Sequence, residues 1–191
     1  MLKSPLIAAI FIGLFLLSSC KNNSSVLPKP KAQLSLKYPD VTYTLFNTDC
    51  PFSFEYSDVA QVTVKNNCWI TINYPLLKAS IDITYKPVTN NIKELLQDAE
   101  KLTYSHAIKA DGISSQPYIN TSKKVYATLY NVTGNAASQL QFHATDSTLN
   151  FITGAVYFNA VPNYDSIYPA VNYLEKEVRH LVESISWKNK N

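Results

Sequence analysis

The sequence predicts a single α+β domain in which an antiparallel sheet is layered with two amphipathic helices. Over residues 43–85 and 125–160, apolar and polar side chains alternate in short runs, which is the period of half-buried antiparallel strands. Over residues 90–108 and 166–186, apolar residues recur every three or four positions, which is typical of an amphipathic helix. Such elements pack as layers around one core.

The first 19 residues have the features of a lipoprotein signal peptide. Lys3 supplies a basic start, and the apolar run at residues 6–17 is too short to span a bilayer. Leu-Ser-Ser-Cys at residues 17–20 resembles a bacterial lipobox, in which the cysteine is acylated, for example with palmitate, and becomes the first mature residue. Several acyl chains attach a protein firmly to a membrane. We therefore expect a lipid anchor at Cys20; the alternative is an ordinary signal peptide.

Residues 20–33 predict a flexible tether, because polar residues are followed there by spaced prolines. The domain proper is expected over residues 34–191. Lys21 stands where an aspartate would favour retention in the inner membrane, and the acidic cluster typical of surface-exported lipoproteins is missing. Both observations favour the periplasmic face of the outer membrane, with the inner membrane as the alternative.

Charge and cysteine content narrow the possible functions. The chain has 17 basic and 14 acidic residues, and loss of Lys3 leaves 16 against 14, a balance of +2. Because basic residues do not cluster, no nucleic-acid partner is expected. Cys50 and Cys68 remain as a pair in an exported protein, and they share strand parity with the apolar Phe52 and Ile70. A disulfide is predicted; two buried free thiols are the alternative.

The first helix is expected over residues 90–108, with an apolar stripe through Ile92, Leu95, Leu96, Ala99 and Leu102. Asp111-Gly112 then marks the exit into a loop that continues through Pro117. His106 continues the apolar stripe and is expected to be packed.

A three-stranded meander is predicted between residues 125 and 160. Its last strand is apolar on both parities, so it is expected to lie centrally with cover on each side. In the final helix, at residues 166–186, Glu175 and Arg179 are spaced for an ion pair.

Four segments carry a resemblance to a known family. Residues 50–56 (CPFSFEY), 68–75 (CWITINYP), 104–111 (YSHAIKAD) and 142–163 resemble the gliding-motility lipoprotein GldD family of Bacteroidetes. The resemblance implies a cell-envelope lipoprotein of gliding motility and the linked type IX protein secretion machinery. It also implies other envelope proteins as partners, with no enzymatic activity, cofactor or small-molecule substrate. More loosely, the arrangement of elements is similar to the Mog1/PsbP-like fold.

Signatures of catalysis or metal binding are weak. The familiar nucleophile, zinc and phosphate-loop motifs are absent, and the chain has only four glycines. Glu177, His180 and Glu183 can share a face of the last helix, but carboxylate-bridged metal sites need such a motif twice. No metal site is therefore expected.

Tyr126, Tyr130 and His143 lie on the polar parity of neighbouring predicted strands, so they are a candidate interaction surface. The alternative is a face that is simply solvated or covered by a helix. The expected role is non-catalytic binding and assembly. The alternative is an envelope hydrolase or peptidoglycan-active enzyme with a site near His143, and a third possibility is a small-ligand carrier.

Two short segments resemble O-glycosylation sites of Bacteroidetes: Asp146-Ser147-Thr148 and Asp165-Ser166-Ile167. Ser147 and Ser166 are the candidate attachment residues. Each segment also has a structural interpretation, as a hairpin turn and a helix cap respectively.

Overall fold

Ten strands and two α-helices make up the part of the chain that the structure describes. This computed structural model describes residue 38 and residues 41–105, 110–159 and 163–188, which all belong to the unit spanning residues 33–191. The elements in chain order are β1 (Tyr43–Phe46), β2 (Phe52–Ser57), β3 (Gln61–Lys65), the 3-10 turn η1 (Asn66–Cys68), β4 (Trp69–Tyr74), the 3-10 turn η2 (Pro75–Leu77), β5 (Ala79–Pro87), α2 (Ile92–Ser105), β6 (Ala110–Asn120), β7 (Val125–Gly134), β8 (Leu140–Thr145), β9 (Asn150–Phe158), α3 (Tyr164–Ser184) and β10 (Ser186–Trp187).

Seven of these strands form one antiparallel sheet in the order β3-β4-β5-β9-β8-β7-β6. The chain builds this sheet from two meanders, β3-β4-β5 and β6-β7-β8-β9. The meanders join where β5 pairs with β9, from Ala79 opposite Phe158 to Pro87 opposite Asn150. The other three strands form a small sheet in the order β1-β2-β10. The predicted α+β class, with antiparallel sheet and two helices, is confirmed.

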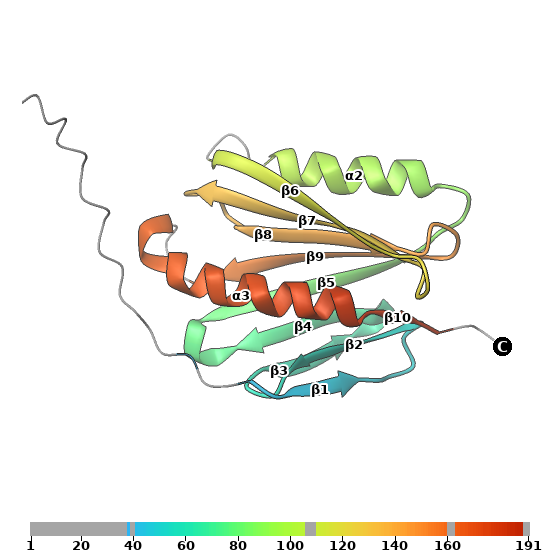
Figure 1. Ribbon diagram of the computed structural model, residues 1–191, viewed down its shortest axis with the longest axis horizontal. Coiled ribbons are helices and arrows are strands. Elements are labelled where there is room, and N and C mark those ends of the chain that lie inside the picture. The colour runs from blue at the N-terminus through green and yellow to red at the C-terminus, as the bar shows by residue number, and fades with distance from the viewer. Residues whose placement is uncertain (1–37, 39–40, 106–109, 160–162, 189–191) are drawn as a thin grey trace, which may run out of the picture. The chain divides into compact units, whose positions relative to one another are not determined.

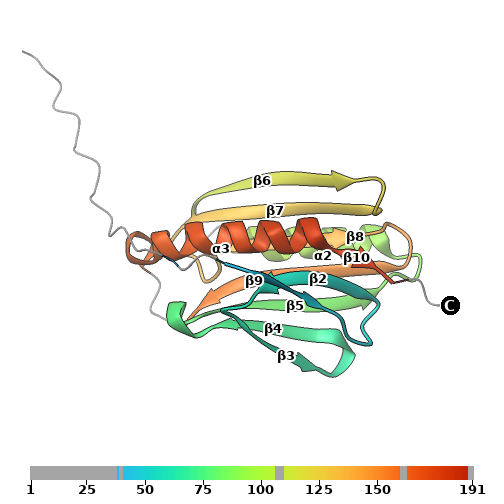
Figure 2. The ribbon, with the colours of Figure 1, turned by 60° about the horizontal axis from the view of Figure 1, so that its bottom comes forward.

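The two helices lie on opposite faces of the large sheet. Neighbouring residues of a strand point to opposite faces, and Ile152 of β9 belongs to the main core whereas Phe151 packs with Leu95 and Ala99 of α2. The main core fills the space between the sheet, α3 and the small sheet. α3 contacts β2, β7 and β8, while α2 contacts β8 and β9. Figures 1 and 2 show α2 away from β3 and β4.

β9 is the fourth of the seven strands, which confirms the prediction of a central strand with cover on each side. Its Gly154 leaves room for a neighbouring ring. A Cβ added there would lie 2.2 Å from Cε1 of Phe142 on β8, well inside van der Waals contact. A glycine at this position lets the phenyl ring lie over the strand in the main core.

The first helix begins two residues later than predicted, and most of its predicted apolar stripe packs on the sheet. It spans Ile92–Ser105, and the predicted end, with His106, lies outside the described residues. The buried positions are Leu95, Ala99 and Thr103, whereas Leu102 is exposed. Ile92 and Leu96 pack against the same cluster, so Leu102 is the one residue of the predicted stripe that stays exposed.

The predicted loop at residues 111–117 is wrong. Those residues belong to β6, which pairs with β7 along the edge of the sheet, with an irregularity between Ala110 and Gly112. Pro117 fits in β6 because an edge strand has one side without ladder partners, so a missing N–H costs little there. The Gly and Pro in this segment favoured a loop in the sequence, yet they mark an edge strand.

α3 begins two residues earlier than predicted and ends at Ser184. Its N-cap is Asn163, whose side chain accepts the backbone N–H of Ser166, so the predicted capping role of Asp165-Ser166 falls to this asparagine. The predicted ion pair is confirmed, with Arg179 Nη2 3.8 Å from Glu175 Oε1. After the helix, Trp187 pairs with β2 in the short strand β10.

Cys50 and Cys68 are joined by a disulfide, with their Cα atoms 5.7 Å apart. Cys50 precedes β2 of the small sheet, and Cys68 precedes β4 of the large sheet. Cys68 and the preceding Asn67 both have left-handed backbone conformations, with φ of 56° and 61°. The cross-link therefore connects the two sheets at the turn that leads into β4.

Candidate functional site

A cleft of about 120 Å³ lies between α2 and the large sheet. Residues of β5, β7, β8, β9 and α2 line it: Asp82, Thr84, Ala99, Leu102, Thr103, Tyr130, Gln141, Phe142, His143, Thr153, Gly154, Ala155 and Tyr157. The main contacts of α2 with the sheet are with β8 and β9, and the cleft lies beside them.

Strand register fixes the floor of this cleft. Gln141 of β8 lies opposite Ala155 of β9, which lies opposite Asp82 of β5. In the next row of the same face, His143 lies opposite Thr153. The β9 residues in these rows have small side chains, which leaves open space above the sheet.

His143 is held as a neutral imidazole. It is only 7% exposed, and burial lowers the pKa of its ring to about 4. The ring stacks on Phe151, with centroids 6.0 Å apart, and lies 5.8 Å from the Tyr130 ring. Its Nδ1 has no hydrogen-bond partner. A catalytic histidine usually has that atom oriented by a carboxylate, and His143 lacks such a partner.

Gln141 is the second polar residue at the base of the cleft, and it is 5% exposed. Its Oε1 lies 3.1 Å from the Thr103 hydroxyl, which also lies 3.1 Å from the carbonyl of Ala99. The amide Nε2 has no partner. A buried polar group without a hydrogen bond costs about 1–3 kcal/mol, so Gln141 and His143 each contain one costly unpaired atom that is closed off from solvent.

The predicted interaction surface of Tyr126, Tyr130 and His143 is corrected by these positions. All three residues do share one face, because Tyr126 lies opposite Thr145 and the alternation of β7 and β8 is regular. However, Tyr130 and His143 are buried and Tyr126 is half-buried. Polar parity suggested a solvent-facing surface, but α2 covers this part of the sheet.

An exposed surface lies next to the cleft, on the β3-β4-β5 side of the same sheet face. It includes Lys65, Trp69, Asn73, Ser80, Asp82 and Tyr157, and we call it the open sheet face. Trp69 is 53% exposed and Tyr157 is 39% exposed. Burial, and to a smaller extent the Asp82 carboxylate, raises the pKa of Tyr157. This face was not predicted from the sequence, although the alternation of polar residues in β4 and β5 is typical of it.

The opposite side of the molecule holds a buried carboxylate. Glu177 of α3 accepts hydrogen bonds from the hydroxyls of Tyr43 at 3.2 Å and Tyr74 at 3.3 Å. Burial raises the pKa of Glu177, an effect that the two hydroxyls partly offset. Burial together with the charge of Glu177 raises the pKa of Tyr43 to about 12. In the sequence, Glu177 could have been recognised as buried because it lies three residues after Leu174, within the apolar stripe of the helix.

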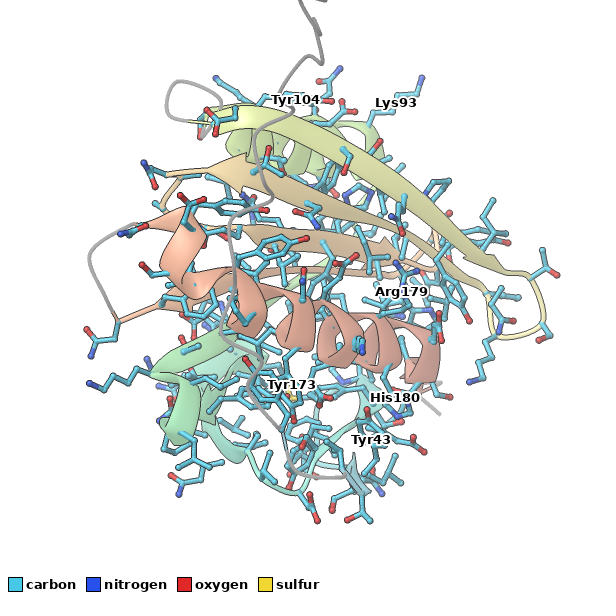
Figure 3. All side chains as sticks on the ribbon, turned by 60° about the vertical axis from the view of Figure 1, so that its left-hand side comes forward. Tyr43, Lys93, Tyr104, Tyr173, Arg179 and His180 are labelled. Atoms are coloured by element: carbon cyan, nitrogen blue, oxygen red, sulfur yellow. A yellow bond between two sulfur atoms is a disulfide. The ribbon has the colours of Figure 1, made fainter. Side chains whose placement is uncertain are left out.

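His180 lies one turn further along α3 and faces Tyr43, as Figure 3 shows. The two rings stack with centroids 3.6 Å apart, and His180 Nε2 lies 2.8 Å from Glu55 Oε2. Glu183 is exposed. Within the described ranges, no group of three or more His, Cys, Asp or Glu side chains could hold a metal ion. Glu177 and His180 instead connect α3 to β1 through Tyr43, and His180 connects it to β2 through Glu55.

The remaining predicted site residues differ in what the structure says of them. Cys20 lies outside the described residues. Ser147 is exposed in a turn with φ of 66°, and Ser166 is exposed in the first turn of α3. Asp146 closes the former turn by accepting three backbone N–H groups, from Thr148 to Asn150. Glycosylation at either serine stays a prediction.

The described residues therefore form a single-domain α+β protein with a seven-stranded antiparallel sheet and a small polar cleft. Among these residues, no helix has the length and apolarity needed to cross a membrane.

Comparison with known proteins then gives the family. The family model described as "Gliding motility lipoprotein GldD" matches residues 23–187, so the chain belongs to this family of gliding motility lipoproteins. No curated protein matches the chain. Among solved structures, it is similar to the cyanobacterial PsbP protein (CyanoP) of Synechocystis sp. PCC 6803, with a TM-score of 0.47 and 7% identity. That similarity covers 82% of this chain and 97% of CyanoP.

Proposed function

We propose that this lipoprotein serves gliding motility as a non-catalytic binding and assembly factor of the cell envelope, acting with the type IX protein secretion machinery. Acyl chains on Cys20 attach it to the membrane, and its place is the periplasmic face of the outer membrane, with the inner membrane as the alternative. Its partners are other envelope proteins. Membership of the gliding motility lipoprotein family supports the biological setting.

The observation that carries the binding role is the open sheet face. Most sheets of this kind bury one face and leave the other polar, but here two large aromatic side chains, Trp69 and Tyr157, stand on the outer face. Aromatic residues are enriched in the buried centres of protein interfaces, because they combine a large apolar area with a polar atom. Lys65 and Asp82 on the same face add charges of both signs, which suits a polar rim around such a centre.

The cleft gives less support to a hydrolase near His143. Burial keeps the imidazole neutral, and its Nδ1 has no carboxylate to orient it. A general base needs a partner of this kind and a nucleophile within hydrogen-bond reach. The binding role therefore remains the better-supported function.

Crosslinking in intact cells tests the proposal. A photoreactive amino acid at Trp69 should capture an envelope protein, whereas the same group at Tyr104 should not. The two residues are a matched pair, because both are 53% exposed but Tyr104 lies on α2, off the open sheet face. The double variant Trp69→Ala, Tyr157→Ala should also lose gliding at normal protein levels. Normal gliding of that variant, or equal capture at both positions, would refute the role of this face.

A further inference from the structure

A second pocket, of about 590 Å³, opens at the end of the domain where the β6–β7 turn, the β8–β9 turn and β10 meet. Figures 1 and 2 show these three segments at the same end of the molecule. The volume lies within the range of ligand sites, about 300–1,000 Å³. The three segments are far apart in the chain, so only the tertiary structure forms this pocket.

The pocket has an excess of positive charge. Three lysines line it, Lys123 and Lys124 from the β6–β7 turn and Lys188 after β10, against the single carboxylate of Asp146, which gives 3 − 1 = +2. No carboxylate of the described residues lies within ion-pair distance of the three ammonium groups. Those of Lys123 and Lys188 donate instead to backbone carbonyl groups. The three positive charges therefore favour an anionic ligand.

Both turns that carry the pocket are fixed by side-chain hydrogen bonds. One oxygen of Asp146 accepts three backbone N–H groups of its own turn, and the other accepts the side-chain amide of Asn150 at 2.7 Å. In the β6–β7 turn, the side-chain oxygen of Asn120 accepts the Ser122 hydroxyl at 2.7 Å and the Lys123 N–H at 3.0 Å. The wall of the pocket is therefore preorganised before a ligand binds.

Apolar side chains stand beside the lysines. Leu149 lines the pocket and is 66% exposed, and the half-buried Trp187 lines it too. The indole N–H of Trp187 donates to the carbonyl of Lys124 at 2.9 Å, which places the ring next to the basic turn. On surfaces that contact membranes, apolar side chains enter the headgroup region and lysines meet the charge of anionic lipids. A free phosphate ion would leave Leu149 in water.

We propose that this end of the domain docks on the surface of the membrane that holds the lipid anchor, with an anionic lipid headgroup in the pocket and Leu149 in the headgroup layer. The inference rests on the proposed function for the acyl chains at Cys20, and on the pocket alone for its chemistry.

The anchor brings the pocket within reach of a bilayer. Seventeen residues separate Cys20 from Tyr38, the first residue that the structure describes. An extended chain of that length spans up to about 60 Å, so it lets the domain turn this end to the membrane. Because the acyl chains already hold the protein at the surface, a weak attraction is enough to keep the domain docked.

Photo-crosslinking in vesicles tests the docking. The acylated full chain, with a photoreactive amino acid at Leu149, is reconstituted in vesicles of phosphatidylcholine alone or in an equal mixture with phosphatidylglycerol. Capture of lipid at Leu149 should be several-fold higher in the mixed vesicles. It should fall in about 1 M salt, where the Debye length is about 3 Å.

Leu76 is the matched position for the crosslinker. It is 87% exposed but lies in η2, at the far end of β5 from the β8–β9 turn, so it should capture little lipid in either vesicle. Equal capture at the two positions, or capture at Leu149 that ignores lipid charge, would overturn the proposal. So would capture of a protein in place of lipid at Leu149 in intact cells.

Lysine variants test the charges. Lys123→Gln with Lys124→Gln should weaken the attraction about thirtyfold, so lipid capture at Leu149 should fall to the level at Leu76. Lys78→Gln with Lys101→Gln removes the same charge from exposed positions outside the pocket and should leave capture unchanged. Equal effects of the two double variants would refute the role of the pocket.

Two comparisons separate the proposal from its neighbours. Inorganic phosphate should reduce capture no more than chloride at equal ionic strength, and stronger competition by phosphate would show a site for the free ion instead. Protein that floats with the vesicles without lipid capture at Leu149 would count against the docking and not against the acyl anchor. Charge-dependent capture at Leu149 without protein capture at Trp69 would count against the proposed function and not against the docking.

Discussion

Acidification should destabilise this protein through His143. The ordinary histidine pKa is 6.5, and burial lowers the pKa of the His143 ring to about 4 in the folded chain. Between these values the unfolded chain binds the proton and the folded chain does not, so the free energy of unfolding falls as the pH falls. The contribution is complete above pH 6.5 and is lost towards pH 4. A difference of 2.5 in pKa corresponds to about 3 kcal/mol.

Urea unfolding of the full chain at pH 7, 6, 5 and 4, monitored by far-UV circular dichroism, measures the contribution of His143 to the free energy of unfolding. The His143→Gln variant cannot take up the proton, so its stability relative to wild type should rise by about 3 kcal/mol between pH 7 and pH 4. Other titrating groups, such as Glu177, contribute equally to both proteins and cancel in the difference. Thr153→Val, opposite His143 in the sheet, changes packing without titrating and should keep the wild-type pH dependence. Parallel curves for wild type and His143→Gln would refute the reasoning.

Substitutions at three further places probe the fold. Replacing Cys50 and Cys68 with alanine opens a cross-link over 18 positions and should cost about 3 kcal/mol in urea unfolding, an effect that reductant should reproduce in wild type. Gly154→Ala forces a Cβ against the Phe142 ring and should cost about 1–3 kcal/mol, seen as a lower Tm; an unchanged Tm would contradict the packing. Glu177→Ala leaves two tyrosine hydroxyls unpaired and should cost about 1–3 kcal/mol, whereas Glu177→Gln, which keeps an acceptor, should cost less by the same assay.

Strand periodicity identified most of the sheet, because alternation depends only on neighbouring residues. It failed for β6, where Gly112 and Pro117 suggested a loop. An edge strand needs hydrogen bonds on one side only, so it tolerates residues that a central strand excludes. The sequence could not reveal that β7 would offer those bonds, since that depends on where the second meander folds.

The candidate site was predicted in part. The alternation placed Tyr126, Tyr130 and His143 on one face, and the pairing of β7 with β8 brings them together. Their burial could not be read from the pattern, because a polar strand face looks the same whether water or a helix lies over it. Here α2 lies over it, so Tyr130 and His143 line a cleft, and Trp69 and Tyr157 are the exposed aromatic residues of the neighbouring open sheet face.

The sequence by itself determined the α+β class, both helices, the family and the candidate cysteine pair, since each depends on local periodicity or on residues close together in the chain. The tertiary structure alone decided that β5 pairs with β9, that α2 covers only part of one sheet face, and that Gln141 and His143 meet in a cleft beside the open sheet face. These features join segments far apart in the chain. Their geometry follows from how much apolar surface each helix can bury, and no local pattern records that quantity.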